Sequence, residues 1–297
     1  MSAFDRIVVI FNPNSTGDAP DAAAELVSHL QGRIEEVPIE SWPTEHAGHG
    51  RELAEQAAGE SRRPLIVSVS GDGGYNEVVD GVARSGNRDA GTAVLAAGNA
   101  NDHRRVTARH PLSEAIIAAI ERDEVAHLDV LRMSVGSGDD PLVRHAHSYI
   151  GLGLTPVVAA DIEHGGKGRL REVLTTVQSF WRYRPFTVRH EDGSDFEFDS
   201  LVFANIPEMA KYAKLSQGRP DDGHFEVVTI PHRNKLKTVA AGLRAALRGL
   251  GPQPSTDRYA FTTIRPVPVQ LDGEVSSIDA DRDVVVDLLP GGLRTVE

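Results

Sequence analysis

The sequence has no cysteine, few aromatic residues (5%) and no long apolar run. Without cysteine the chain cannot form a disulfide framework, a zinc ribbon or a thiol nucleophile. A membrane-spanning helix needs about 20 consecutive apolar residues, whereas even the longer apolar runs here are short, such as Ile7–Phe11 and Val157–Ala160. The N-terminus also lacks a basic region followed by an apolar stretch of signal-peptide length. We therefore expect a cytoplasmic protein with no transmembrane segment.

Basic residues are scarcer than acidic ones. The 31 Lys and Arg against 43 Asp and Glu give a net charge of −12. Nucleic-acid-binding proteins normally carry a basic surplus, so this balance argues against such a partner. Apolar residues make up 40% of the 297 residues, enough for a packed core. That length suits two domains of about 100–200 residues each.

The first half of the chain alternates apolar runs with segments of helical periodicity. Strands are predicted at Arg6–Phe11, Ile34–Ile39, Pro64–Ser68 and Thr92–Leu95, and helices at Asp21–Leu30, Gly48–Ala58, Glu77–Ala83 and Leu112–Arg122. This order predicts a doubly wound α/β domain with a mostly parallel sheet, over residues 1–128.

The second half is dominated by runs of β character separated by turn signals. They are His127–Val135, His145–Ile150, Phe186–His190, Phe196–Ala204, Phe225–Ile230, Tyr259–Arg265, Pro268–Leu271 and Val284–Leu289. Two helical stretches interrupt them, at 169–183 and 235–250. The pattern predicts an antiparallel sandwich or barrel over residues 129–297.

A glycine-rich loop, Ser70-Gly71-Asp72-Gly73-Gly74, follows a buried strand and opens a helix. Glycines let the backbone approach a ligand closely, and the free N–H groups of a helix N-terminus attract anions. Asp72 in such a loop could act through Mg²⁺ beside phosphates. Alone, however, a Gly-Asp-Gly sequence is equally typical of an ordinary strand–helix turn.

Two more loops of small and polar residues follow predicted strands, at Gly98–Asp102 and Asn12–Gly17. The carboxyl ends of parallel strands meet at one edge of the sheet, where open α/β sheets bind ligands. Three such loops at one edge favour a ligand site over chance.

Five motifs in order resemble the catalytic domain of the diacylglycerol kinase family, which includes bacterial soluble lipid kinases and sphingosine kinases and is related to NAD kinases. They are Asn12–Gly17, Ser70–Val79, Gly98–Asp102, Asp221–Gly223 and Asp272–Glu274. The resemblance implies an N-terminal α/β nucleotide-binding domain, a C-terminal antiparallel β-sandwich domain for the acceptor, and an active site in the cleft between them. It implies ATP and Mg²⁺ as cofactors and a role in phospholipid metabolism.

The resemblance also implies residue roles. Glu274 would be the general base toward a lipid hydroxyl, and Asp72 and Asp102 would hold the catalytic Mg²⁺. Nucleotide contacts would fall on Asn12, Pro13, Asn14, Ser15, Thr16, Gly17, Thr44, Ser70, Gly71, Asp72, Gly73, Gly74, Asn76, Gly98, Asn99 and Asn101. A separate structural Mg²⁺ would be held by Asp222 and the carbonyls of Arg219 and His224.

The chain departs from the family pattern at four positions. Ser70 replaces a glycine, Gly74 and Asn99 replace threonines, and Thr16 is an extra residue before Gly17. Two threonine hydroxyls near the phosphates are thus missing, while the carboxylates are kept. We interpret this as an altered nucleotide pocket.

Several alternatives stay open. Asp272-Gly273-Glu274 alone predicts a hairpin turn, and only its place in the ordered set favours a base. The acceptor could be a sphingoid base or another small molecule, or the fold could serve a non-catalytic nucleotide or lipid sensor. An NAD kinase is disfavoured by the Asn-Glu-Val-Val continuation and the late Asp-Gly-Glu.

Two pairs of histidines and two basic stretches remain to be interpreted. His46 and His49, like His145 and His147, fit no metal motif, which favours solvated or hydrogen-bonded histidines. Basic residues gather in 167–189 and 233–248, either as ordinary solvated helix faces or as a surface peripheral to an anionic membrane that carries the lipid. Whether the chain forms a homodimer is not decided.

Overall fold

The structure is a computed structural model that describes residues 3–15, 18–97, 111–137, 141–153, 185–206, 208–209, 213–214, 218–232 and 252–296. The chain divides into two compact units. The first unit is Met1–Val130 together with Pro290–Glu297, and the second unit is Leu131–Leu289.

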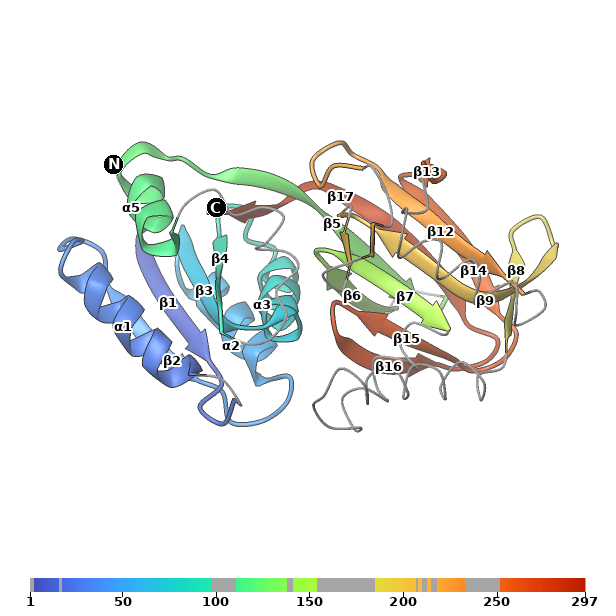
Figure 1. Ribbon diagram of the computed structural model, residues 1–297, viewed down its shortest axis with the longest axis horizontal. Coiled ribbons are helices and arrows are strands. Elements are labelled where there is room, and N and C mark those ends of the chain that lie inside the picture. The colour runs from blue at the N-terminus through green and yellow to red at the C-terminus, as the bar shows by residue number, and fades with distance from the viewer. Residues whose placement is uncertain are drawn as a thin grey trace. The chain divides into compact units, whose positions relative to one another are not determined.

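The first unit is built on a parallel sheet. Its strands are β1 (Arg6–Phe11), β2 (Ile39–Pro43), β3 (Pro64–Ser70) and β4 (Gly91–Ala96). They lie in the spatial order β2, β1, β3, β4, and each neighbouring pair is parallel (Figure 1). All residues of β3 from Pro64 to Val69 are buried, as a continuous apolar run predicts for a strand covered on both faces.

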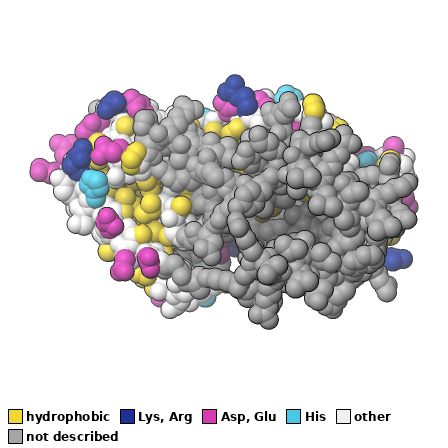
Figure 2. Space-filling model, viewed as in Figure 1, with side chains coloured by type: hydrophobic (Ala, Val, Ile, Leu, Met, Phe, Trp, Pro, Cys, Tyr) yellow, Lys and Arg dark blue, Asp and Glu magenta, His cyan; other side chains and the backbone are white. Residues whose placement is uncertain are grey.

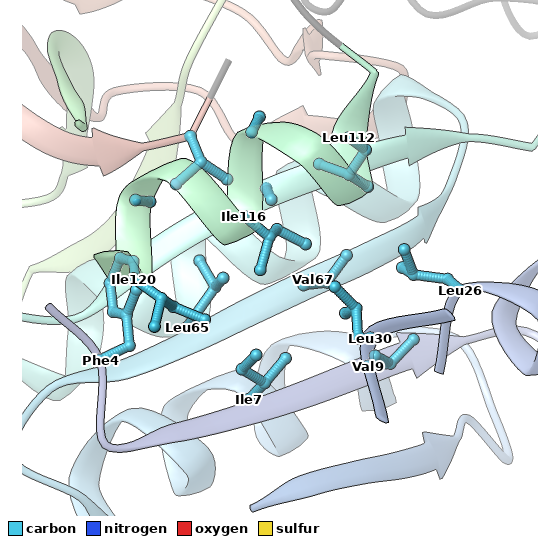
Figure 3. Close-up of a cluster of buried hydrophobic side chains, with 14 of the residues drawn as sticks. Phe4, Ile7, Val9, Leu26, Leu30, Leu65, Val67, Leu112, Ile116 and Ile120 are labelled. Carbon is cyan, nitrogen blue, oxygen red and sulfur yellow. The ribbon is translucent and has the colours of Figure 1, made fainter. Parts of the chain in front are cut away.

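Helices cover both faces of this sheet (Figure 1). They are α1 (Ala19–Gln31), α2 (His49–Glu60), α3 (Asp72–Ser85) and α5 (Leu112–Arg122). On one face, Leu30 of α1 and Ile116 of α5 pack with Ile7 and Val67 of the sheet (Figure 3). On the other face, α2 and α3 pack around Ile66. This two-sided cover is the doubly wound arrangement that alternating strands and helices predict.

The end of β17 (Asp283–Thr295) completes the first unit. Arg294 and Thr295 pair in parallel with Gly91 and Thr92 of β4. The sequence predicts that all of residues 129–297 form the second domain. In the structure, residues 290–297 belong to the first unit instead. Pairing between residues about 200 positions apart has no local sequence signal.

Helices α2 and α3 approach each other closely at Gly81. A Cβ atom added there would overlap Arg51 O and lie 2.8 Å from Ala54 Cβ and 2.9 Å from Glu55 N. Gly81→Ala is therefore expected to lower the free energy of unfolding by about 1–3 kcal/mol, because the two helices must move apart. Urea unfolding followed by circular dichroism measures this change.

Gly59→Ala, on α2, is the matched control because no atom lies within 4 Å of a Cβ added at that position. It is expected to raise the free energy of unfolding by about 0.5–1 kcal/mol, since alanine is the better helix former. Equal effects of the two substitutions would contradict a close helix–helix contact at Gly81.

The second unit consists of antiparallel strands around one hydrophobic core. Its strands are β5 (Ala126–Val135, which begins in the first unit), β6 (Leu142–Ala146), β7 (Tyr149–Gly153), β8 (Phe186–His190), β9 (Asp195–Ala204), β10 (Glu208–Met209), β11 (Ala213–Lys214), β12 (Phe225–Pro231), β13 (Ser255–Thr256), β14 (Arg258–Thr263), β15 (Val267–Leu271) and β16 (Glu274–Ile278). The main path runs β16, β15, β7, β9, β8, β14, β17, with β12 also on β9, and β5 pairs with β6. Leu131, Ile150, Phe203 and Phe225 are fully buried in the core.

Several strands differ from the sequence prediction, and the two-residue strands β10, β11 and β13 are absent from it. The second strand is at Ile39–Pro43 and not at Ile34–Ile39, because the N–H of Ile34 still bonds to Leu30 O at the end of α1. The run His145–Ile150 is divided between β6 and β7, and β16 was not predicted. The break between β6 and β7 lies at residues 147–149, whose N–H groups bond to the Asp272 carboxylate. Among the described residues, no helix has the length and apolar character to cross a membrane.

Candidate active site

A cavity of about 410 Å³ opens at the carboxyl ends of the parallel strands in the first unit. Loops after β1, β2 and β3 form its walls, as the position of ligand sites in open α/β sheets predicts. The lining residues are Ile10, Phe11, Asn12, Asn14, Thr44, Glu45, His46, Ala47, Gly50, Ser68, Ser70, Gly74 and Glu77.

The cavity brings together predicted nucleotide contacts from three separate loops. Asn12 and Asn14 follow β1, Thr44 follows β2, and Ser70 and Gly74 flank the start of α3. Of the other predicted residues, Pro13, Ser15, Gly71, Asp72, Gly73 and Asn76 lie in the same loops or in the first turns of α3. Thr16, Gly17, Gly98, Asn99, Asn101 and Asp102 lie outside the described residues.

Helix α3 begins at Asp72, and its N-terminus is suited to an anion. Gly71 is the N-cap residue, has an extended backbone and makes no side-chain capping hydrogen bond. The N–H groups of the first turn have no partners within the helix, and the helix dipole adds partial positive charge. Since Gly74 of this turn lines the cavity, phosphate oxygens are a chemically suitable ligand there.

Glu77 fixes the wall that carries Thr44. Its two carboxylate oxygens accept the N–H groups of Gly48 and Gly50, each at 3.0 Å. Gly48 is the left-handed N-cap of α2 (φ 83°) and supplies no side-chain cap, so Glu77 takes that role from another helix. A Cβ atom at Gly50 would lie 2.7 Å from Glu77 Oε2, so a side chain there would displace this carboxylate. No local sequence pattern predicts this role for Glu77, because its partners Gly48 and Gly50 are far away in the chain.

Glu77→Gln is expected to lower the free energy of unfolding by about 1–3 kcal/mol, because an amide NH₂ would face one of the two backbone N–H donors. If the cavity binds a nucleotide as the sequence predicts, the affinity for it should also fall severalfold, because the loop bearing Thr44 loosens. Glu52→Gln, an exposed change in the first turn of α2, is the control. Urea unfolding and nucleotide titration check both effects, and identical behaviour of the two variants would contradict the bracing role.

His46, His49 and Glu52 form a small cluster beside this wall. One potential metal-ligand atom from each lies within 4.8 Å of the others, and the two imidazole rings are stacked. His49 Nδ1 accepts the N–H of Glu45 at 2.9 Å, so a neutral His49 keeps its proton on Nε2, which opposes coordination through that atom. The hydrogen-bonded role that the sequence favours for these histidines therefore suits this geometry.

In the second unit, Asp272 is completely buried and organises the chain around it. Its carboxylate accepts the backbone N–H groups of His147 at 2.7 Å, Ser148 at 3.2 Å and Tyr149 at 2.7 Å. These donors cannot join a strand ladder, which explains the break between β6 and β7. His147 Nε2 also lies 3.4 Å from Asp272 Oδ2.

Asp272 and Gly273 form the two-residue turn between β15 and β16. Both have positive φ (44° and 102°), and Leu271 pairs with Glu274 across the turn. This is the hairpin geometry typical of an Asp-Gly pair. Glu274 is the first residue of β16, its side chain is about one-third exposed, and Arg144 Nη2 lies 3.8 Å from its Oε1.

The loop before β12 holds the residues predicted to bind a structural Mg²⁺. Asp222 accepts the N–H groups of Arg219 at 3.2 Å and His224 at 3.1 Å, and Gly223 has a left-handed φ of 75°. The Arg219 guanidinium pairs with Asp221 instead. A carboxylate and main-chain carbonyls are oxygen ligands of the kind that Mg²⁺ prefers, so the chemistry of the predicted ligand set fits the ion.

A parallel α/β unit and an antiparallel unit are the two parts of the fold that diacylglycerol kinases and NAD kinases share. The chain is similar to a crystal structure of a diacylglycerol kinase from Bacillus anthracis str. Sterne, with a TM-score of 0.72 at 18% identity over 100% of this chain and 98% of that one. It is also similar to yeast NADH kinase complexed with NADH, with a TM-score of 0.62 at 13% identity over 99% and 83%. At these identities the likeness establishes the fold.

A family model matches the first part of the chain. The family model described as the diacylglycerol kinase catalytic domain matches residues 6–133, which include the loops that line the cavity. This match, which covers less than half of the chain, and the kinase folds above together support a kinase with a diacylglycerol-kinase-like catalytic domain. The family resemblance predicted from the motifs is confirmed. No curated protein matches the chain.

Proposed function

We propose that this protein transfers the γ-phosphoryl group of ATP to a lipid hydroxyl, as a diacylglycerol-kinase-like enzyme. The observation that carries the proposal is the cavity where Asn12, Thr44 and Ser70 from three loops meet beside the α3 N-terminus. The family match to the diacylglycerol kinase catalytic domain supports a lipid as the acceptor.

In the proposed mechanism, the first unit positions the nucleotide. The first turn of α3 donates N–H groups to the phosphates, and the loop braced by Glu77 presents Thr44. Asp72 and Asp102 are the proposed ligands of a catalytic Mg²⁺, which would neutralise phosphate charge. Asp72 is the first residue of α3, beside the cavity, so its carboxylate suits this role, whereas Asp102 lies outside the described residues.

Glu274 is the proposed general base. It takes the proton of the acceptor hydroxyl as that oxygen bonds to the γ-phosphorus and the bond from phosphorus to the leaving ADP oxygen breaks. A partly exposed carboxylate on a rigid hairpin can perform this step. Asp222, with the carbonyls of Arg219 and His224, is the proposed structural Mg²⁺ site of the same unit.

Two other functions are kept as alternatives. A sphingoid base or another small hydroxylated molecule would use the same machinery with a different acceptor pocket. A non-catalytic nucleotide or lipid sensor is favoured by the departures at Ser70, Gly74 and Asn99, and opposed by the retained Asp72, Asp102 and Glu274.

We also propose that the enzyme meets its lipid at an anionic membrane surface from the cytoplasmic side. The two basic stretches behind this idea lie almost wholly outside the described residues. On the described part of the face in Figure 2, Lys and Arg side chains are scattered and do not gather into a patch. Sedimentation with anionic vesicles tests it: charge reversal at Lys235, Lys237 and Arg244 should abolish binding, and unchanged binding would reject it.

The test of the main proposal is a transfer assay from γ-labelled ATP across a panel of diacylglycerols, sphingoid bases and small polyols. Transfer to diacylglycerol that is lost in Asp72→Ala supports the proposal. Transfer to another acceptor selects the second kinase function. Nucleotide binding without transfer to any acceptor selects the sensor, and transfer that survives Asp72→Ala rejects the assigned site.

A further inference from the structure

Two departures from the family pattern are in direct contact. The resemblance expects glycine at position 70 and threonine at position 74, whereas this chain has Ser70 and Gly74. A Cβ atom added at Gly74 would lie 2.7 Å from both Cβ and Oγ of Ser70. Non-bonded atoms at optimal contact are about 3.5–4.0 Å apart, so such a pair overlaps. In this backbone, one of the two positions can carry a side chain, but not both.

The Ser70 hydroxyl lies beside the point where a side chain at position 74 would begin, 2.7 Å from the Cβ atom that it would have. Ser70 is the last residue of β3, Gly74 lies in the first turn of α3, and both line the cavity. Moving the side chain from helix to strand therefore keeps a hydroxyl within 2.7 Å of the place where the position-74 Cβ would lie.

Neighbouring groups orient this hydroxyl. Ser70 Oγ donates to Gly71 O at 3.0 Å and lies 2.6 Å from Ser68 Oγ. A hydroxyl has one proton, so while Ser70 donates to Gly71, the proton shared with Ser68 belongs to Ser68. Ser68 is 2% exposed and is held in the strand. It can go on donating to Ser70 while the Ser70 proton turns from Gly71 O to an acceptor in the cavity.

We propose that Ser70 donates the side-chain hydrogen bond to the nucleotide phosphates that a threonine at position 74 cannot make in this chain, and that Ser68 positions it. The inference rests on the proposed function, because it takes the cavity to bind a nucleoside triphosphate. On this view the two changes belong together: the hydroxyl that is missing at position 74 is replaced by the hydroxyl of Ser70. The departures at Ser70 and Gly74 then cease to favour a sensor over a kinase.

The first test compares the binding of MgATP and of adenosine by calorimetry. Ser70→Ala is expected to raise the Kd for MgATP about tenfold, as for a lost hydrogen bond to a charged group. The Kd for adenosine, which has no phosphate, should not change. Ser28→Ala, an exposed serine of α1, is the control and should leave both values unchanged.

The second test exchanges the two positions. Gly74→Thr alone should weaken MgATP binding because its side chain overlaps Ser70. Ser70→Gly combined with Gly74→Thr should restore a Kd within about threefold of wild type, a strongly non-additive result. Thermal melting confirms that each variant is folded.

The outcomes separate this inference from the proposed function. Wild type that binds MgATP while Ser70→Ala binds equally well overturns the role of Ser70 and leaves the kinase proposal standing. Additive losses in the double variant overturn the exchange. Wild type that binds no MgATP rejects the proposed function and this inference together.

Discussion

Asp272→Ala is expected to lower the free energy of unfolding by at least about 3 kcal/mol, the largest stability effect that this structure predicts. The substitution leaves the N–H groups of His147, Ser148 and Tyr149 without their acceptor in a fully buried site. Each buried donor left unsatisfied costs about 1–3 kcal/mol. Alanine also tolerates the positive φ of 44° poorly, whereas asparagine accepts such a backbone.

Urea unfolding measures the global effect, and amide hydrogen exchange in residues 147–149 measures the local one. Asp272→Asn should be milder, since it keeps one acceptor oxygen and the turn conformation. Asp257→Ala, an exposed aspartate of the same unit, is the control and should change stability by less than about 0.5 kcal/mol. If Asp272→Ala matched this control, the buried carboxylate would not be organising the β6–β7 break.

Glu274→Gln is expected to have the largest effect on activity, lowering kcat by about 10²–10⁴-fold through loss of the general base. Stability should stay close to wild type, because the side chain is partly exposed and glutamine has the same shape. Glu197→Gln, an exposed change on β9, controls for the removal of a carboxylate elsewhere in the unit. Initial rates at saturating ATP with the accepted lipid provide the measurement.

A Glu274→Gln variant with more than one-tenth of the wild-type rate would remove Glu274 from the role of base. The comparison with Asp272 sharpens this test, since the two acids are two residues apart on one hairpin. A loss of rate with intact stability indicates chemistry at Glu274. A loss of both, as expected for Asp272→Ala, indicates that the hairpin itself has been disturbed.

The sequence predicts the fold well wherever periodicity is local. β1, α5 and β8 have the predicted limits, and the βα alternation gives the parallel sheet. What local pattern cannot provide is pairing at a distance. The return of β17 to β4 depends on such contacts, and so does the break between β6 and β7.

The same distinction holds for the candidate site. Small-residue loops after successive strands predict that Asn12 and Ser70 meet, and the family resemblance adds Thr44; all three line one cavity. Glu77 and Asp272 went unassigned because each acts on backbone N–H groups remote in sequence. In the sequence, Ser70 and Gly74 are two separate departures from the family pattern. Only their proximity in space shows that they depend on each other.

The end of β17 has a consequence for how the first unit is made. The kinase-family match ends at residue 133, yet the strand beside β4 comes from residues 294 and 295, and Thr295 Oγ1 donates to Thr92 O. During synthesis β4 therefore stays without its β17 partner until residues 294 and 295 have left the ribosome. An unpaired strand edge invites pairing with other chains. A fragment cut at the family boundary would keep that edge permanently, so any expressed form of the first unit should retain residues 290–297.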